Sequence, residues 1–267
     1  MMLNPLDLPQ QPVPERRFQV DFLSVEVYHS EAELAKSAAL FAHTYLRETL
    51  AQKEGATILL ATGKSQLKFL DELIALGGID WQKITFFHLD EYLGIEAEHP
   101  ASFRRYLRER VESRVKPKQF HYLEGDARQP LDECDRYANL LKAQPIDLCC
   151  LGLGENGHLA FNEPEVADFN DPRLVKLVKL DRVTQQQQVN QGLFPTVAAV
   201  PQYAFTLTLP LLGTAKKLLC LAPEKRKATA VKKMLQGAVS VECPASFLRS
   251  QAQAILWLDV DSASLLT

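Results

Sequence analysis

Short apolar runs alternate with amphipathic stretches of helical period along most of this chain. Residues 57–61 (Thr-Ile-Leu-Leu-Ala) are apolar on both faces, which is typical of a strand buried inside a parallel sheet. In the segment that follows, 65–76, leucines and an isoleucine recur on one side of a helix. A repeated strand–helix order of this kind predicts an α/β fold in which helices cover both faces of the sheet.

The same reading extends to the whole sequence. Strands are expected at 20–28, 57–61, 83–89, 120–123, 146–151, 174–180, 204–209, 218–222 and 255–259. Helices are expected at 30–52, 65–76, 102–111, 131–141 and 228–235, with Ser30 and Ser102 as N-caps and Glu33 as a capping-box partner of Ser30. We therefore predict a Rossmann-like, doubly wound, mostly parallel sheet, whose loops after the strands share one edge where ligands bind.

Domain organisation follows from the prolines and from the absence of a linker. Four prolines in residues 1–18 predict an extended N-terminal arm, and residues 19–267 are predicted to form a single domain. The segment 165–200, which contains a run of glutamines, is either a lid over the site or an ordinary long connection.

Composition excludes several classes of function. A net charge of -3 and an isoelectric point near 6.1 leave no basic surface for nucleic acid. No apolar run approaches the roughly 18 residues of a membrane helix, and the N-terminus has no signal-peptide pattern. The five cysteines form no C-x-x-C pair, so they are expected to be buried thiols of a cytoplasmic protein, with no disulfides and no metal site.

Residues 61–66, Ala-Thr-Gly-Lys-Ser-Gln, follow a predicted strand and open a predicted helix. They end like a P-loop, but position 58 is isoleucine where that motif requires glycine. What remains is a glycine turn with a hydroxyl at a helix N-terminus, which favours either a bound phosphate or a plain serine cap.

Two further loops carry ionisable side chains at the ends of strands. Asp90 and Glu91 follow the strand 83–89, and Asp90 is a candidate general base; otherwise one carboxylate caps a turn and the other is solvated. Residues 152–158 form a glycine-rich turn that ends in His158, with Glu163 five positions later as a candidate partner that orients the ring. The glycine spacing also matches a dinucleotide-binding motif, but Asn-Glu-Pro at 162–164 interrupts the helix that such a motif needs.

Residues 224–228, Glu-Lys-Arg-Lys-Ala, place cations at the start of a predicted helix. Cations oppose the helix dipole there, so a bound anion would explain them; a solvated run of charges is the alternative.

Together these segments resemble the glucosamine-6-phosphate deaminase/isomerase family, which shares a fold with 6-phosphogluconolactonases. Gly-Glu-Asn-Gly-His-Leu-Ala-Phe-Asn-Glu-Pro at 154–164 is similar to the family's D-G-H-I-A-F-N-E-P signature. The stretch 86–94 resembles M-D-E-Y-x-G, and 61–65 resembles the phosphate loop T-G-G-T-P. The segment 224–237 resembles the helix that supplies a phosphate-binding lysine, and the resemblance spans residues 20 to 260.

The resemblance implies a hydrolase/isomerase of amino-sugar metabolism that acts on a sugar phosphate without metal or organic cofactor. Asp90 would move the C2 proton to C1, while His158, with Glu163 and Asn156, would open the sugar ring. The substrate-binding residues would be Thr62, Gly63, Lys64, Ser65, Gly154 and Lys227. Family members differ in oligomeric state, so a homo-oligomer is compatible with the resemblance.

Two positions depart from the family pattern and leave the substrate open. Asn156 stands where the family often has aspartate, and an expected phosphate-binding arginine has only Arg182 as its nearest candidate, with Lys64 as a substitute cation. Glucosamine 6-phosphate is the expected substrate. Galactosamine 6-phosphate, a 6-phosphogluconolactonase activity and a non-catalytic sugar-phosphate sensor are the alternatives.

Overall fold

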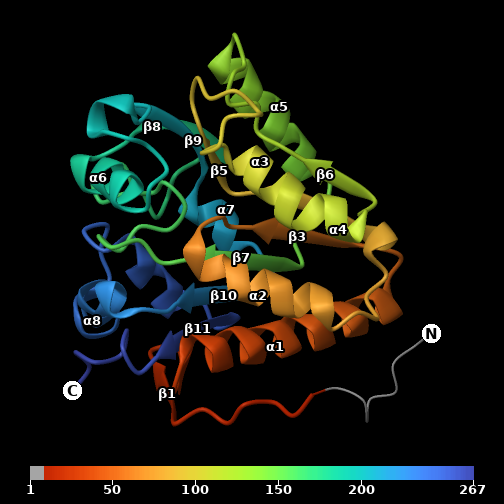
Figure 1. Ribbon diagram of the computed structural model, residues 1–267, viewed down its shortest axis with the longest axis vertical. Coiled ribbons are helices and arrows are strands. Elements are labelled where there is room, and N and C mark those ends of the chain that lie inside the picture. Colours follow the sequence, from red (N-terminus) through yellow and green to blue (C-terminus); the bar gives the residue numbers. More distant parts are fainter. Residues whose placement is uncertain (1–8) are drawn as a thin grey trace.

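The computed structural model describes residues 9–267, and its centre is an eight-stranded sheet (Figure 1). Its strands, in spatial order, are β1 (Arg16–Val20), β2 (Leu23–Tyr28), β11 (Ala254–Asp259), β10 (Lys217–Ala222), β7 (Leu148–Gly152), β3 (Ala56–Leu60), β4 (Ile84–His88) and β6 (Gln119–His121). All neighbouring strands are parallel except β1 and β2. The predicted mostly parallel sheet is confirmed.

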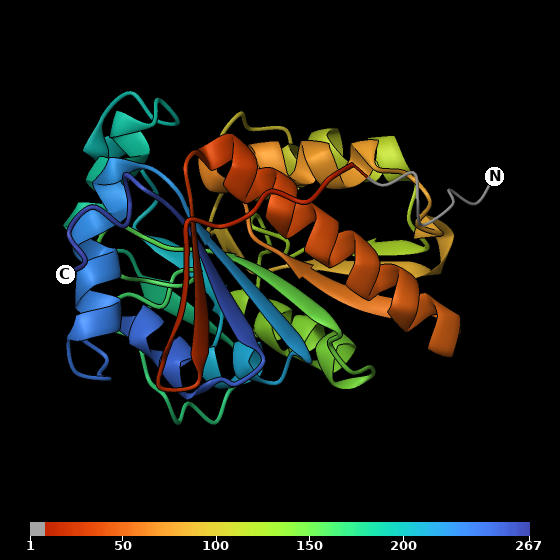
Figure 2. The same ribbon diagram turned by 90° about the horizontal axis from the view of Figure 1, so that it is seen from below.

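Helices cover both faces of this sheet, as the alternation predicts (Figure 2). One face carries α1 (Glu31–Gln52), α2 (Lys64–Ala75), α3 (Phe103–Leu107) and α4 (Ser113–Val115), and the other carries α5 (Pro130–Lys142), α7 (Leu209–Gly213) and α8 (Ala228–Gln236). Successive side chains of a strand point to opposite faces, so Ile58 and Leu60 pack with the first group and Leu59 with the second. This is why the central strands are apolar throughout.

A second, smaller sheet lies beside the first and was not predicted. Strand β5 (Asp90–Tyr92) pairs antiparallel with β9 (Tyr203–Leu207), which pairs antiparallel with β8 (Val175–Lys179). The expected strands at 174–180 and 204–209 therefore exist but do not join the parallel sheet. Val178, Leu180 and Ala204 from these segments pack in a separate core around Tyr92 and Phe161, whereas Phe205 and Leu207 join the core of the large sheet.

The N-terminal boundary also differs from the prediction. The expected strand 20–28 is two strands, separated by a turn in which Asp21 has a φ of 52°. Residues 16–18, assigned to the arm, belong to β1 and pair with 25–27. The rest of the predicted arm lies partly outside the described residues.

The predicted helix starts and thiols agree with the structure. Ser30 accepts a hydrogen bond from the Glu33 N–H at 3.2 Å, and Ser102 accepts one from the Arg105 N–H at 3.4 Å. The Glu33 carboxylate bonds to the His29 N–H rather than to that of Ser30, so the capping box is shifted by one residue. All five cysteines are buried free thiols.

The strand order reverses at the centre of the large sheet. After β3 the chain runs outward through β4 to β6, then returns to place β7 on the other side of β3 and continues through β10 to β11. The ends of β3 and β7 are therefore neighbours in the sheet, and the loops that follow them lead away in different directions. In open α/β sheets such a switch point is where ligands bind.

Candidate active site

A cavity opens at this switch point and gathers most of the residues that the sequence singled out. Eight of the ten expected residues line it: Thr62, Gly63, Lys64, Ser65, Asp90, Gly154, His158 and Lys227. Asn156 and Glu163 do not line it. The lining comes from the loops after β3, β4, β7 and β10, which are far apart in sequence.

The loop after β3 forms one end of the cavity. Gly63 has a φ of 103°, which disfavours any residue with a Cβ, and it stands at the N-cap of α2 without a side-chain cap. The first N–H groups of α2 are therefore open to an anion. The hydroxyl of Tyr106 donates to the Gly63 carbonyl at 3.1 Å and holds the loop in place. Lys64 is exposed and also lines the cavity.

The cationic side of the cavity comes from the loop after β10. Lys227 is buried, and burial, followed by the charge of Arg226, lowers its pKa to about 8. No carboxylate forms an ion pair with Lys227 among residues 9–267. Arg226 also lines the cavity, but Glu155 and Glu224 each contact its guanidinium at 2.9 Å. Lys227 is thus the cation best placed to neutralise a bound anion.

Asp90 reaches the cavity because the chain crosses there from the large sheet to the small one. It is the first residue of β5, it pairs with Thr206 of β9, and the Leu207 N–H donates to the Leu89 carbonyl at 2.9 Å. The backbone thus fixes the carboxylate at the cavity wall. Burial, with the charge of Glu91 added, raises the pKa of Asp90 well above its ordinary value.

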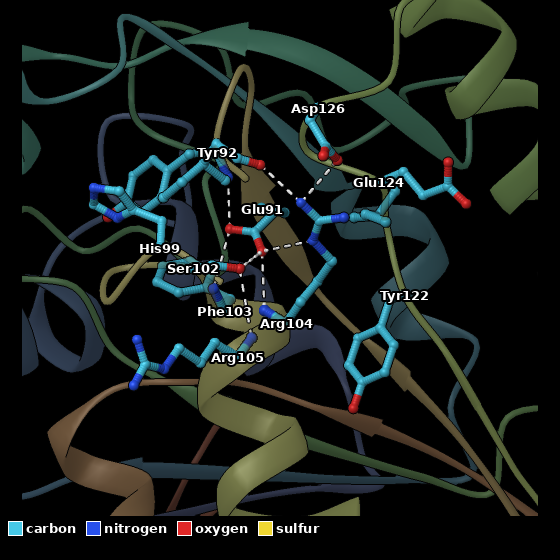
Figure 3. A network of polar contacts seen from close by, with 12 residues as sticks. Glu91, Tyr92, His99, Ser102, Phe103, Arg104, Arg105, Tyr122, Glu124 and Asp126 are labelled. Atoms are coloured by element: carbon cyan, nitrogen blue, oxygen red, sulfur yellow. Dashed lines mark hydrogen bonds and ion pairs between the residues drawn. The ribbon is translucent and has the colours of Figure 1, made fainter. Parts of the chain in front are cut away.

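The neighbouring carboxylate, Glu91, is neither solvated nor in the cavity. It is fully buried and accepts hydrogen bonds from the N–H groups of Tyr92, Phe103 and Arg104 at 2.9 to 3.1 Å and from the Ser102 hydroxyl at 2.8 Å (Figure 3). These donors belong to β5 and to the first turn of α3. Glu91 therefore ties that helix to the strand that carries Asp90, which is the turn-capping role considered for one of the two acids.

His158 lies in a tight turn that requires its glycines. A Cβ on Gly154 would lie 2.3 Å from the imidazole ring, so the ring rests directly against the backbone. Gly157 has a φ of 88°, and a Cβ there would lie 2.7 Å from the Cys243 sulfur. The Gly154 N–H donates to the His158 carbonyl at 2.9 Å and closes the turn. Gly154 thus places the histidine, in addition to lining the cavity.

The partner of His158 differs from the one expected. Its Nδ1 lies 2.7 Å from Asn156 Oδ1 and 3.3 Å from Thr184 Oγ1, and no hydrogen bond joins it to Glu163 in the described chain. Glu163 therefore makes no direct hydrogen bond to the ring, and its part in orienting the ring stays a prediction. Burial, and then the charge of Lys227, lowers the pKa of His158 to about 3, so the ring is neutral near pH 7.

Glu163 is anchored to Asp181, the residue before α6 (Arg182–Asn190). Its Oε2 accepts the Asp181 N–H at 2.6 Å, and burial raises the pKa of the carboxyl to about 7. The preceding Asn162 donates its side-chain amide to the carbonyls of Leu159 and Leu207. The Asn-Glu-Pro end of the motif therefore fastens the histidine turn to β9 and to α6.

The glutamine run forms part of the cavity wall. It lies in α6, and Gln187, Gln188 and Gln191 line the cavity together with Phe103, Phe161 and Leu193, none of which is among the ten expected site residues. Arg182 is exposed and does not line it. The arginine at the site is Arg226, whose signal was its place beside Lys227 in the basic segment.

Residues 9–267 contain neither a metal-binding cluster nor a membrane-spanning helix. Groups of three or more histidine, cysteine, aspartate or glutamate side chains with a geometry fit for a metal ion are absent from this part of the chain. Its helices are also too short or too polar for any of them to cross a membrane.

Comparisons with known proteins agree with this geometry. Residues 29–257 match the family model described as glucosamine-6-phosphate isomerases/6-phosphogluconolactonase. The chain is 34% identical over 236 residues to glucosamine-6-phosphate deaminase of Exiguobacterium sibiricum, covering 88% of this chain and 91% of the relative. It is 33% identical to the enzyme of the same name from Bacillus cereus, covering 91% and 89%.

Solved structures give the same fold. A monomeric glucosamine-6-phosphate deaminase superimposes with a TM-score of 0.84 at 31% identity, covering 90% of this chain and 99% of that one. A 6-phosphogluconolactonase from Thermotoga maritima superimposes with a TM-score of 0.72 at 21% identity, covering 89% and 99%.

Proposed function

The chain belongs to the family of glucosamine-6-phosphate isomerases and 6-phosphogluconolactonases, and within it we propose that this protein converts glucosamine 6-phosphate and water to fructose 6-phosphate and ammonia. The observation that carries the proposal is the convergence of Asp90, His158 and an anion-binding helix start on one cavity. The similarity to deaminases at 33–34% identity supports the same reaction.

The phosphate of the substrate binds at the N-terminus of α2. The first N–H groups of the helix and the hydroxyls of Thr62 and Ser65 donate to it, and Lys227 supplies a positive charge. An anion beside Lys227 offsets the burial that lowers the pKa of this lysine, so the bound lysine is charged. The exposed Lys64, which also lines the cavity, adds a cation.

Ring opening falls to His158. Its Nδ1 is engaged by Asn156, so Nε2 is the nitrogen that faces substrate. A neutral imidazole accepts the proton of the anomeric hydroxyl at Nε2 and returns it to the ring oxygen, while the bond between C1 and that oxygen breaks. The product of this step is the open-chain aldehyde.

Isomerisation falls to Asp90. The carboxylate removes the proton from C2 and delivers it to C1, while O1 gains a proton and the 2-amine loses one. The aldehyde carbon thus becomes a hydroxymethyl group and the 2-amine becomes a 2-imine. Water then adds to C2 and ammonia leaves, which gives the ketose. The raised pKa of Asp90 makes the carboxylate a stronger base for a carbon-bound proton.

The test is release of both products from glucosamine 6-phosphate by the wild type and by Asp90→Asn. We expect equal amounts of ammonia and fructose 6-phosphate, and a kcat lower by about 10³-fold in the variant, within the range for loss of a general base. Asp132→Asn makes the same chemical change on the exposed first turn of α5 and serves as the matched control.

Two results would contradict the proposal. Absence of both products with the wild type would exclude this reaction, and galactosamine 6-phosphate and 6-phosphogluconolactone would be assayed next. An Asp90→Asn variant with full activity on the lactone would identify a hydrolase that needs no C2 base.

The thiols support a place for the reaction in a reducing compartment. All five cysteines are buried and unpaired, which fits the expected cytoplasmic location. We propose that location together with the activity. The related deaminase with a solved structure is monomeric.

A further inference from the structure

Asn156 stands between the imidazole of His158 and a second carboxylate, that of Asp181. Its side-chain Oδ1 lies 2.7 Å from His158 Nδ1 and also accepts the His158 backbone N–H at 3.1 Å. Its Nδ2 donates to Asp181 Oδ2 at 2.8 Å. The amide therefore bridges the ring and the carboxylate in a relay of hydrogen bonds that runs from Asp181 through Asn156 to His158.

The two ends of this chain fix the orientation of the amide. A backbone N–H can only donate, so the atom of Asn156 that faces it is the oxygen. A carboxylate can only accept, so the atom that faces Asp181 is the nitrogen. With the oxygen turned to the ring, His158 Nδ1 must carry the proton, and Nε2 is left as the unprotonated atom on the cavity side.

Asp181 itself is held rigidly. It is the N-cap of α6, and its Oδ1 accepts the Thr184 N–H at 2.6 Å. Its own N–H donates to Glu163 Oε2 at 2.6 Å. One oxygen is thus committed to the helix and the other to Asn156, and the side chain cannot turn away from the relay without uncapping α6.

We propose that Asp181 is a positioning residue of the site, which acts through Asn156 to hold His158 in the Nδ1-protonated form and to place a negative charge behind the ring. The inference rests on the proposed function. During ring opening the proton from the anomeric hydroxyl joins Nε2, and the resulting imidazolium gains from that charge before the proton passes to the ring oxygen. The carboxylate missing at position 156 is supplied one residue further away.

The relay can be tested by exchanging its two members. In Asp181→Asn the helix cap is retained, but two amino groups face one another, so the relay loses a hydrogen bond whichever way the Asn156 amide turns. We expect kcat to fall by about 10²-fold, less than for loss of a carboxylate in direct contact with a catalytic histidine, with KM within about threefold. Asp181→Ser, which also caps a helix but does not reach Asn156, should lose a similar factor at an unchanged unfolding temperature.

The double variant Asn156→Asp with Asp181→Asn reverses the order of amide and carboxylate. Every hydrogen bond of the relay can re-form, with the charge now next to the ring, so we expect kcat to return to within about fivefold of wild type. A residue that only stabilises α6 would give no such recovery. Wild-type kcat in both Asp181 variants, or no recovery in the double variant, would overturn the proposal.

A measurement without substrate separates this inference from the proposed reaction. The ¹⁵N shifts of the His158 ring, assigned by comparison with His158→Gln, report which nitrogen carries the proton. We expect protonated Nδ1 in the wild type and in the double variant, and loss of that single tautomer in Asp181→Asn. An unchanged tautomer in Asp181→Asn would contradict the relay even if the protein proves inactive on glucosamine 6-phosphate.

Discussion

The Asp90 side and the His158 side of the cavity hold their reactive groups by different means. Asp90 is placed by backbone pairing between β5 and β9, and its nearest charged neighbour is the buried Glu91. His158 is placed by side chains and by a glycine that lets the ring touch the backbone. Perturbations should therefore act on Asp90 through charge and on His158 through geometry.

Among changes that leave both Asp90 and His158 in place, the largest effect on this comparison should come from filling the space beside the histidine. In Gly154→Ala the new Cβ would lie 2.3 Å from the ring, while the backbone conformation is one that alanine adopts. The ring must move, and a displacement of about 1 Å at a catalytic group costs about 10²-fold in kcat. Steady-state kinetics and the unfolding temperature would be measured together.

Removal of the ring provides the control for this clash. In a His158→Ala background the alanine at 154 has nothing to collide with, so the second change should cost less than about threefold. Independent, multiplicative losses would show that Gly154 matters for another reason, such as the approach of its backbone to substrate.

On the Asp90 side, Glu91→Gln should lower stability and shift the pH profile. The amide places an NH₂ group against two N–H or O–H donors, and we expect a loss of about 2–4 kcal/mol in the free energy of unfolding. Removal of the charge also removes one cause of the raised pKa of Asp90. Since the base must be ionised, the rising acid limb of kcat/KM should move to lower pH.

Ser102→Ala separates the two effects of that change. It removes one donor to Glu91 and the cap of α3 but keeps the carboxylate, so stability should fall by about 1 kcal/mol. The acid limb should stay where it is. A shift of equal size in both variants would mean that disorder, and not charge, governs Asp90.

The smallest effect is expected at the phosphate end of the cavity, formed by the start of α2 and Lys227, where ligand affinity should depend on pH. The pKa of Lys227 is lowered to about 8, so in the ligand-free protein the lysine loses its charge as pH rises through 8. Binding of fructose 6-phosphate, which has no amine to titrate, should weaken by up to about tenfold between pH 7 and 9. Calorimetric titration at each pH would measure this.

Two variants test whether Lys227 causes that pH dependence. Lys227→Met should bind more weakly at pH 7 and show a flat profile up to pH 9. Arg182→Ala, which removes an exposed charge that does not line the cavity, should behave as the wild type. A sloping profile in Lys227→Met would assign the titration to another group.

The fold was predictable where pattern and burial coincide. A strand inside a parallel sheet must be apolar on both faces, so runs such as 57–61 identify themselves. The small sheet could not be predicted in this way. β8 and β9 are recognisable as strands, but nothing in their sequences indicates which strands they pair with. The hairpin of β1 and β2 was missed because residues 20–28 look like one continuous strand in the sequence. Only the structure shows that Asp21 and Phe22 form a turn.

The site was predictable for residues that meet at one edge and not for those that act through others. The ends of β3, β4, β7 and β10 carry the lining, and their motifs stand directly after apolar runs. Side-chain partners depend on three-dimensional placement. Glu163, five positions from the histidine, does not touch it, whereas Asp181 and Thr184, more distant in sequence, lie next to its turn.

The order of strands has a consequence for synthesis on the ribosome. β3 gains its inner neighbour only when β7 has emerged, and β2 gains its neighbour in the parallel sheet only with β11, the final strand. Lys227 follows β10, so a nascent chain that already contains Asp90, His158 and the start of α2 still lacks the buried cation of the phosphate end. The partly synthesised protein therefore exposes an incomplete sheet without a working site, and chaperones would meet it in that inactive state until β10 and β11 have emerged.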